Sequence, residues 1–240
     1  MPKKTAKTGA NEKFMGIALR LAAKGAPSPN PYVGAVIVKN GKIIGKGFHR
    51  KAGMAHAEIE ALRSLKRASD AKGATLYATL EPCAHYGRTP PCTKAIIESG
   101  IKRVVFAMKD PNPRVKGNGE KELIGAGINV DGGILEKEAR KLNEVFVKYS
   151  TTGLPFVVLK VALSADGKTV ARRGGSRWIT GEEARGHARR LRGKYDAILV
   201  GINTILADNP RLTARNRGLT DPIRIILDSK LRIPLNSKVL

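Results

Sequence analysis

The sequence predicts an α/β protein in two parts: a three-layer α/β/α domain at residues 11–150 and a shorter α/β segment at residues 154–240. Two observations support this prediction. Helical and strand-like apolar patterns alternate along the first part, which is typical of helices that cover a sheet. A polar stretch at residues 150–153 then interrupts the pattern, and a new apolar run follows it. With 240 residues and an apolar fraction of 42%, the chain can bury a sizeable core.

The first part is expected to begin with a short, polar lead-in at residues 1–10. This segment has no following apolar stretch of the kind that a secretory signal requires. Asn11 is then expected to cap a helix, because Asn is a favoured residue at that position. The apolar residues Phe14, Ala18 and Leu21 would share one face of this helix.

A hairpin is predicted next, because the Asn40-Gly41 pair separates two strand-like runs at residues 33–39 and 42–48. The remaining elements of the first part alternate between helix and strand. They are expected as helix 57–65, strand 74–80, helix 93–98, strand 103–108, helix 120–126, strand 128–130 and helix 136–149.

The second part is expected to open with a strand at residues 156–163. A capping box from Thr180 to Glu183 predicts a helix that runs to about Arg192. Strands are expected at 197–200 and 223–227. This segment is shorter than most domains and has no closing element, so we expect it to be the first half of a domain.

Composition limits the classes of ligand and compartment. The net charge of +24 favours phosphate-bearing ligands, whether a small substrate, a dinucleotide or a nucleic acid. No run of about 18 apolar residues predicts a membrane span. Only two cysteines occur, without a secretory signal, which indicates a reducing cytoplasm rather than a disulfide framework. Cys83 and Cys92 are therefore expected to be metal ligands or unpaired thiols.

Four residues form a candidate catalytic zinc site: His56, Glu58, Cys83 and Cys92. A catalytic zinc takes three protein ligands and keeps one position open, and it lowers the pKa of water to about 7. His56, Cys83 and Cys92 would be the ligands. Glu58 would be the carboxylate that moves protons without binding the metal. A lone His-x-Glu means little and two cysteines can be buried thiols, but together they follow the H-x-E … P-C … C pattern of nucleobase deaminases.

The cysteine loop and two flanking motifs resemble a known family. Zinc deaminases usually have P-C-x-x-C, whereas here eight residues separate the cysteines. Residues 28–36 read S-P-N-P-Y-V-G-A-V, and residues 110–113 read D-P-N-P. Together these closely resemble the bifunctional riboflavin-biosynthesis deaminase/reductase family over nearly the whole chain from Asn11. The resemblance implies a cytidine-deaminase-like domain joined to the first half of a dihydrofolate-reductase-like domain.

The resemblance also implies a substrate for the first part. It would be 2,5-diamino-6-ribosylamino-4(3H)-pyrimidinone 5′-phosphate, which zinc-dependent deamination converts to the aminouracil. The same likeness implies that six residues bind this substrate, at its pyrimidine ring, its anionic group and its ribose side. These are Asn30 and His49 at the ring, His85 and Arg88 in the cysteine loop, and Asp110 and Asn112 on the ribose side.

Further motifs in the second part resemble the reductase domain: S-A-D-G at 164–167, S-R-W-I-T-G at 176–181 and L-A-D-N-P at 206–210. The likeness implies substrate contacts by Ser176, Arg192, Leu212 and Arg215, and NADPH contacts by Ala162, Trp178, Thr204 and Asp208. The cofactor loop and closing strands of the family follow this region. We therefore expect deamination from this chain, reduction only if the second domain is complete, and association into homo-oligomers.

Two other classes stay open on sequence alone. The chain could be a zinc deaminase of another nucleobase, nucleotide or tRNA, although an aromatic fraction of 5% offers no stacking set for nucleic acid. It could also be a basic, zinc-stabilised binding protein without enzymatic activity. That protein would need the metal but not Glu58, so a requirement for Glu58 in catalysis excludes it.

Overall fold

A computed structural model describes residues 4–87, 90–113, 115–169, 178–215 and 218–240. The chain divides into two compact units, Met1–Val157 and Val158–Leu240, and each is described by itself. Both combine helices with a sheet, so the expected α/β class is confirmed. Within the described residues, no helix combines the length and the apolar character needed to cross a membrane.

The first unit contains a five-stranded sheet in the order β2-β1-β3-β4-β5. β1 runs antiparallel to β2 and β3, whereas β3, β4 and β5 are parallel. The strands are β1 (Gly34–Lys39), β2 (Lys42–Phe48), β3 (Thr75–Leu80), β4 (Arg103–Met108) and β5 (Asn129–Gly132). Nearly every residue of β1, β3 and β4 is buried, as expected of central strands covered on both faces.

The predicted hairpin is confirmed. Asn40 and Gly41 have φ values of 50° and 73°, and both lie in the left-handed region that a two-residue hairpin turn requires. Asn and Gly are the residues that adopt this conformation at least cost, which explains why the pair was such a clear local signal.

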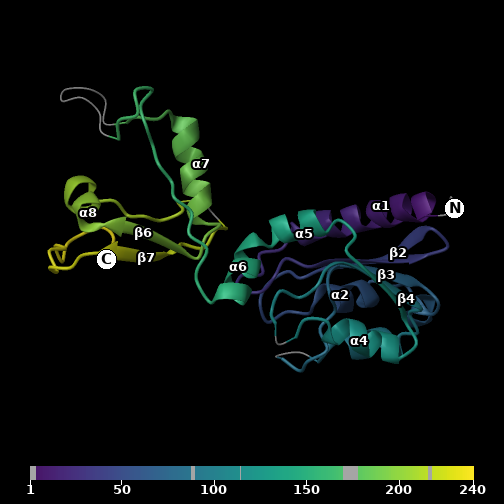
Figure 1. Ribbon diagram of the computed structural model, residues 1–240. Helices are drawn as coiled ribbons and strands as arrows, with labels where there is room; N and C mark the ends of the chain where they lie inside the picture. The colour runs from purple at the N-terminus through teal and green to yellow at the C-terminus, as the bar shows by residue number, and fades with distance from the viewer. Residues whose placement is uncertain (1–3, 88–89, 114, 170–177, 216–217) are drawn as a thin grey trace. The chain divides into compact units, whose positions relative to one another are not determined.

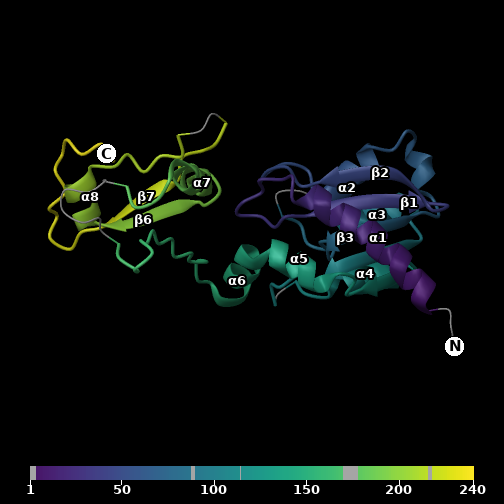
Figure 2. The same ribbon diagram turned by 90° about the horizontal axis from the view of Figure 1, so that it is seen from above.

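Helices cover both faces of this sheet. α1 and α5 lie on one side, whereas α2 and α4 lie on the other (Figure 1), and α1 crosses the strands at an angle (Figure 2). The helices of the unit are α1 (Lys4–Ala22), α2 (Ala57–Arg63), α3 (Cys92–Glu98), α4 (Asn118–Gly125), α5 (Glu136–Leu142) and α6 (Glu144–Thr152), with a 3₁₀ turn at Ala68–Ala71. The three-layer α/β/α arrangement is therefore confirmed.

Four loops lie together at one edge of the sheet because of the directions of its strands. The carboxyl ends of β3 and β4 lie at this edge because the two strands are parallel. β1 is antiparallel to β3, so the segment that precedes β1 reaches the same edge, together with the end of β2. The loops are 30–33, 49–56, 81–91 and 109–117. In open α/β sheets this edge is where ligands bind.

Two expectations for helices in the first unit are wrong. α1 begins at Lys4, so residues 4–10 are helical and Asn11 lies inside the helix instead of capping it. Its side-chain oxygen accepts a hydrogen bond from the Tyr77 hydroxyl at 2.9 Å, a tertiary contact that gives Asn a role within a helix. The single helix expected at 136–149 is two helices, α5 and α6, which meet at Asn143.

The second unit contains a two-stranded parallel sheet of β6 (Ala197–Gly201) and β7 (Ile223–Leu227). Its helices are α7 (Glu182–Arg192) and α8 (Ile202–Asp208), and α8 was not expected from the sequence. A small apolar cluster holds it together, formed by Ile202, Ile205, Leu212 and Val239.

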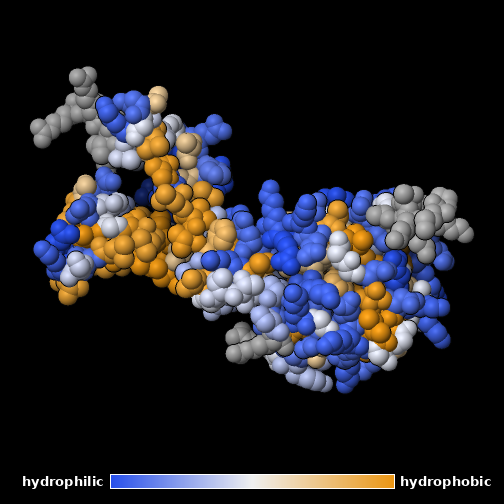
Figure 3. All heavy atoms as spheres, in the orientation of Figure 1, coloured by the Kyte–Doolittle hydropathy of each residue, from blue (hydrophilic) through white to orange (hydrophobic). Residues whose placement is uncertain are grey.

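Two expectations for the second unit are also wrong. Residues 156–163 form no strand, and Val157 and Leu159 are 82% and 85% exposed. The N-cap of α7 is Gly181, with no side-chain capping bond, so the capping box is absent. On the face in view in Figure 3, apolar side chains gather over the β6–β7 sheet, where Ile223 and Leu227 are 68% and 60% exposed. Apolar sheet surface of this kind is normally covered by another layer of protein.

Candidate metal centre

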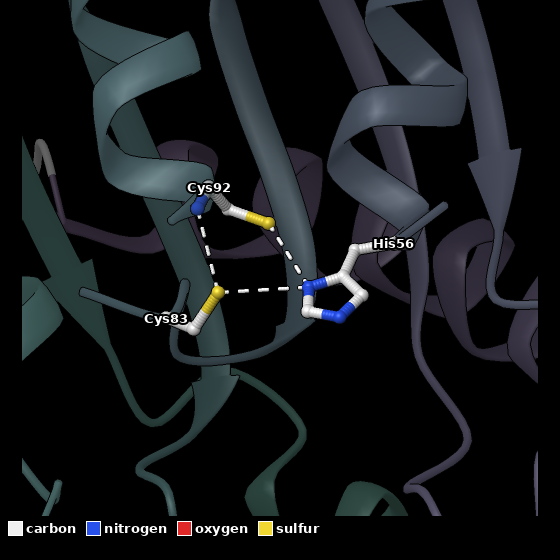
Figure 4. A group of neighbouring side chains, drawn as sticks. All are labelled: His56, Cys83 and Cys92. Carbon is white, nitrogen blue, oxygen red and sulfur yellow. Dashed lines mark hydrogen bonds between the residues drawn. The ribbon is translucent and has the colours of Figure 1, made fainter. Parts of the chain in front are cut away.

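Three donor atoms from separate segments converge at the gathered edge of the sheet. Nδ1 of His56 lies 3.3 Å from Sγ of Cys92 and 3.5 Å from Sγ of Cys83 (Figure 4). The three donor atoms all lie within 4.8 Å of one another. Both cysteines are free thiols.

Local structure positions each of these side chains. His56 directly precedes α2, and Cys92 is the first residue of α3. Cys83 lies in the loop after β3, where the backbone N–H of Cys92 donates to its sulfur at 3.3 Å. The backbone N–H of Thr93 also donates to the Cys83 carbonyl at 3.2 Å. The first turn of α3 therefore holds one cysteine while it carries the other.

The electrostatics of the cysteine pair favour a thiolate. Hydrogen bonding from Cys92 and from His56 lowers the pKa of Cys83 to about 4, although burial opposes the shift. The pKa of Cys92 is raised, because its thiol is hydrogen-bonded to Cys83 and its side chain is buried. Metal binding requires deprotonated thiols, so a cation bound here would release the remaining thiol proton.

Glu58 lies in the first turn of α2, two residues after His56, and is only 4% exposed. Burial, together with the nearby charge of Cys83, raises the pKa of its carboxyl group to about 7. A carboxyl group with a pKa near neutrality can accept a proton and return it.

The donor set fits zinc. Two cysteine sulfurs and one imidazole nitrogen are borderline-soft ligands of the type that zinc prefers. Three protein ligands are also the number found in catalytic zinc sites, which keep a fourth position for water or substrate. His56, Cys83 and Cys92 would hold the ion.

His49 and Asn30 lie next to this centre. The rings of His49 and His56 meet edge to face with centroids 5.5 Å apart. Nδ2 of Asn30 lies 3.0 Å from Nε2 of His49. His49 is 3% exposed, and its burial lowers the pKa of the imidazole, so this ring is neutral at pH 7.

The other expected substrate contacts lie on two loops beside Cys83. The backbone N–H of Asn112 donates to Oδ1 of Asp110 at 2.8 Å. His85 is exposed and lies near enough for its charge to affect the pKa of Asp110, which burial raises. Arg88 lies outside the described residues. The structure thus brings five of the six expected residues to the edge that holds the donor set.

The residues expected to bind the reductase substrate are partly gathered. Arg192 donates from Nη1 to the Thr213 carbonyl at 3.2 Å. Burial lowers the pKa of its guanidinium, and the charge of Arg215 adds to this effect, so two of the expected arginines lie near each other. The Leu212 side chain is buried in the apolar cluster. Ser176 lies outside the described residues.

The residues expected to contact NADPH lie on separate segments of the second unit. Ala162 is in the irregular segment before Gly167, whereas Thr204 and Asp208 are exposed on α8. Trp178 is 56% exposed, and the guanidinium carbon of Arg185 lies 4.7 Å from the centre of its ring. The NADPH contacts expected of these four residues stay a prediction.

Sequence reasoning missed two buried polar residues at this edge. Asn143 is 1% exposed and binds the backbone of Tyr32 twice: its Oδ1 accepts from the N–H at 2.7 Å, and its Nδ2 donates to the carbonyl at 3.0 Å. Glu81 is 4% exposed and accepts hydrogen bonds from the loop at 109–117. Glu81 directly precedes Pro82-Cys83, and this acidic residue after an apolar strand was the one available signal.

Comparison with known proteins agrees with this description. Residues 8–108 match the family described as "Cytidine and deoxycytidylate deaminase zinc-binding region", and residues 155–240 match the "RibD C-terminal domain". The fold, the donor set and these matches place the first unit in the class of proteins with a deaminase-type zinc-binding region, and the second unit among RibD C-terminal domains.

Individual relatives identify the family. The chain is 53% identical to the riboflavin biosynthesis protein RibD of Aquifex aeolicus over 96% of its length, and 46% identical to that of Escherichia coli over 93%. It superposes on RibD of Acinetobacter baumannii with a TM-score of 0.91 and 46% identity, covering 97% of this chain and 67% of that one. The chain belongs to the RibD family. It spans 65% and 64% of the length of the Aquifex and Escherichia proteins.

Proposed function

We propose that the first unit catalyses the hydrolytic deamination of 2,5-diamino-6-ribosylamino-4(3H)-pyrimidinone 5′-phosphate to the corresponding aminouracil, a step in riboflavin biosynthesis. The observation that carries the proposal is a buried carboxyl group, Glu58, beside a three-donor set that fits zinc. A structural zinc site needs no such carboxyl group. It normally has a fourth protein ligand, which leaves no position open for water or substrate. Membership of the RibD family supports the choice of substrate.

His56, Cys83 and Cys92 would hold the zinc ion, and Glu58 would transfer protons. When bound, zinc supplies a water nucleophile near neutral pH. Glu58 would accept one proton from the attacking water and deliver it to a ring nitrogen. It would then accept the second proton from the hydroxyl group left on the ring carbon and deliver it to the amino group, so that the ring gains a carbonyl oxygen and ammonia leaves. A pKa of about 7 suits Glu58 for both directions of transfer.

We infer that the neighbouring loops orient the substrate. Asn30 and His49 would hold the ring beside the metal centre, and Asp110 and Asn112 would contact the ribose. A positive surface, with a net charge of +24 over the chain, would attract the 5′-phosphate. His85 and Arg88 in the cysteine loop would meet the anionic side of the substrate.

For the second unit, we propose NADPH-dependent reduction of the ribosyl group to ribityl in the protein that contains the whole reductase domain. Arg192 and Arg215, together with Ser176 and Leu212, would bind the phosphoribosyl group, because paired guanidinium groups suit a phosphate. Ala162, Trp178, Thr204 and Asp208 would contact the cofactor. The nicotinamide supplies the hydride, so the protein needs only to position it against an open ribose carbonyl.

A paired assay tests both proposals on the same purified protein. Ammonia release and NADPH oxidation would be followed separately with the phosphoribosyl diaminopyrimidine as substrate. We expect ammonia from this chain. NADPH oxidation in addition would show that the second unit is functional at this length. Protein that holds zinc but releases no ammonia would contradict the proposed substrate and favour another amino-substituted ring.

We also infer association into homo-oligomers in a reducing cytoplasm. The exposed apolar surface of the β6–β7 sheet supports association, and the two free thiols suit a reducing compartment. Light scattering coupled to size-exclusion chromatography would measure the mass in solution. A monomeric mass near 25.8 kDa at micromolar concentration would contradict the oligomer.

A further inference from the structure

The buried carboxylate of Glu81 collects three backbone N–H groups from one distant segment. Its Oε2 accepts from Asp110 at 3.2 Å and from Gly117 at 3.0 Å. Its Oε1 accepts from Glu120 at 3.1 Å. A buried carboxylate is costly unless it is hydrogen-bonded, and these three donors provide that compensation.

Two of these donors belong to the start of α4. The N-cap of that helix is Gly117, which has a φ of 80° and no side chain with which to cap. Glu81 provides the missing cap from another part of the chain, and its negative charge suits a helix N-terminus.

The approach of α4 to this point is unusually close. A Cβ atom on Gly119 would lie 1.9 Å from the carbonyl oxygen of Pro82, a distance that no side chain tolerates. Gly119 therefore allows the first turn of α4 to pack on the backbone between Glu81 and Cys83. One contact between the 81–83 backbone and the start of α4 therefore depends on both residues: Glu81 supplies its hydrogen bonds, and Gly119 allows the close approach.

This contact fixes both ends of the 110–117 loop. At one end, Glu81 binds the N–H of Asp110, whose own side chain accepts from the N–H of Asn112. At the other end, Glu81 binds the N–H of Gly117. In between, the carbonyl of Asn112 accepts from the N–H of Lys116 at 3.0 Å. The conformation that presents Asp110 and Asn112 is thus set by a residue two positions before Cys83.

We propose that Glu81 is a positioning residue for deamination. It holds the loop that carries Asp110 and Asn112 at a fixed position relative to the metal centre. The proposal rests on the proposed function, because the loop matters only if it binds the ribose side of the substrate. Glu81 itself touches neither substrate nor metal in this role. Its loss should weaken substrate binding and leave zinc binding and the chemical step largely intact.

The test is Glu81→Gln in the zinc-loaded chain of 240 residues. The amide has nearly the same shape, but its NH2 group must face at least one of the three N–H donors, so one hydrogen bond is lost. We expect KM for the phosphoribosyl diaminopyrimidine to rise about tenfold. We expect kcat to stay within about threefold, because the loop contributes to binding in ground state and transition state alike. Zinc content should be unchanged, and hydrogen exchange at residues 110–120 should become faster.

Matched controls are available in the same helix. Glu120→Gln removes an ion pair with Lys109 but keeps the backbone N–H that Glu81 binds, so its KM should equal that of the wild type. Gly119→Ala disturbs the same contact, because its Cβ would collide with the Pro82 carbonyl oxygen, and it should raise KM as Glu81→Gln does. This variant keeps the test available if Glu81→Gln does not fold. Gly125→Ala, where a Cβ meets open space, is its control.

The outcomes separate this proposal from the proposed function. Wild-type protein that releases no ammonia contradicts the function itself, before any variant is compared. An active wild type with unchanged KM in Glu81→Gln overturns the positioning role. Loss of zinc from Glu81→Gln also overturns it, since the residue would then support the metal ligands and not the substrate loop.

Discussion

The side-chain amide of Asn30 donates a hydrogen bond to Nε2 of His49 over 3.0 Å. The direction follows from the other ring nitrogen, since Nδ1 of His49 lies 3.0 Å from the Ala55 carbonyl, which can only accept. Nδ1 therefore carries the proton and Nε2 is the acceptor. Burial lowers the pKa of His49 and keeps the ring neutral, so the orientation of the Asn30 amide is determined as well.

Asn30→Asp should disrupt this pair, because a carboxylate oxygen would face the acceptor Nε2. We expect kcat/KM for deamination to fall at least about tenfold while zinc content is retained. Steady-state kinetics and metal analysis of the same preparation would check this. Lys24→Ala, an exposed change in the turn after α1, is the control and should have wild-type kinetics. Wild-type kcat/KM in Asn30→Asp would show that the amide does not orient the ring.

Glu58→Gln should retain zinc but lose activity. The amide keeps the shape of the side chain and cannot transfer the proton, so we expect kcat to fall by about 10²–10⁴. The control is Glu60→Gln in the same helix, where the carboxylate pairs with Arg63 at 3.4 Å and the side chain is 27% exposed. Near-normal kcat in Glu58→Gln would favour a binding protein or a different proton carrier.

Cys83→Ser and Cys92→Ser should each lose the metal, because a serine hydroxyl is a much poorer zinc ligand than a thiolate. Elemental analysis should find about one zinc per wild-type chain and far less in either variant. Chelator-treated wild type should lose ammonia release and recover it when zinc is added back. Full activity in metal-free protein would contradict the zinc centre.

Asn143→Ala should destabilise the first unit. It leaves the Tyr32 backbone without two partners and removes the buried side chain between α5 and α6. We expect a loss of about 2 kcal/mol in the free energy of unfolding, measured by urea denaturation. Lys141→Ala, exposed on α5, should change it by less than about 0.5 kcal/mol. An equal effect of the two variants would mean that the Tyr32 contact contributes little.

Tyr77 should make stability depend on pH in the alkaline range. Burial raises its pKa in the folded protein above the ordinary value of about 10. Its contribution is therefore fully present below pH 10 and is lost as the pH rises through the folded pKa. Tyr77→Phe should cost about 1 kcal/mol near neutrality, because the bond to Asn11 is lost. The difference between the two proteins should shrink above pH 10, and a constant difference would contradict the shift.

Local signals predicted much of the first unit. Asn40-Gly41 specified the hairpin because the turn conformation depends on those two residues alone. The apolar runs that became β3 and β4 were recognisable because central strands are buried on both faces. Asn11 misled the prediction of α1, because its polar side chain serves a contact with Tyr77 that lies 66 positions away.

The sequence by itself determined the donor types for zinc and the carboxyl group beside them, since His56-Ala57-Glu58 and the two cysteines are readable as chemistry. Only the tertiary structure decided how the loops around them are held. Asn143 binds Tyr32 across 111 positions, and Glu81 binds Gly117 across 36. Such contacts join backbone groups, which carry no sequence signal, to buried side chains whose partners depend on strand order. The irregular course of residues 156–163 has the same origin, because an apolar run becomes a strand only where a neighbouring strand can pair with it.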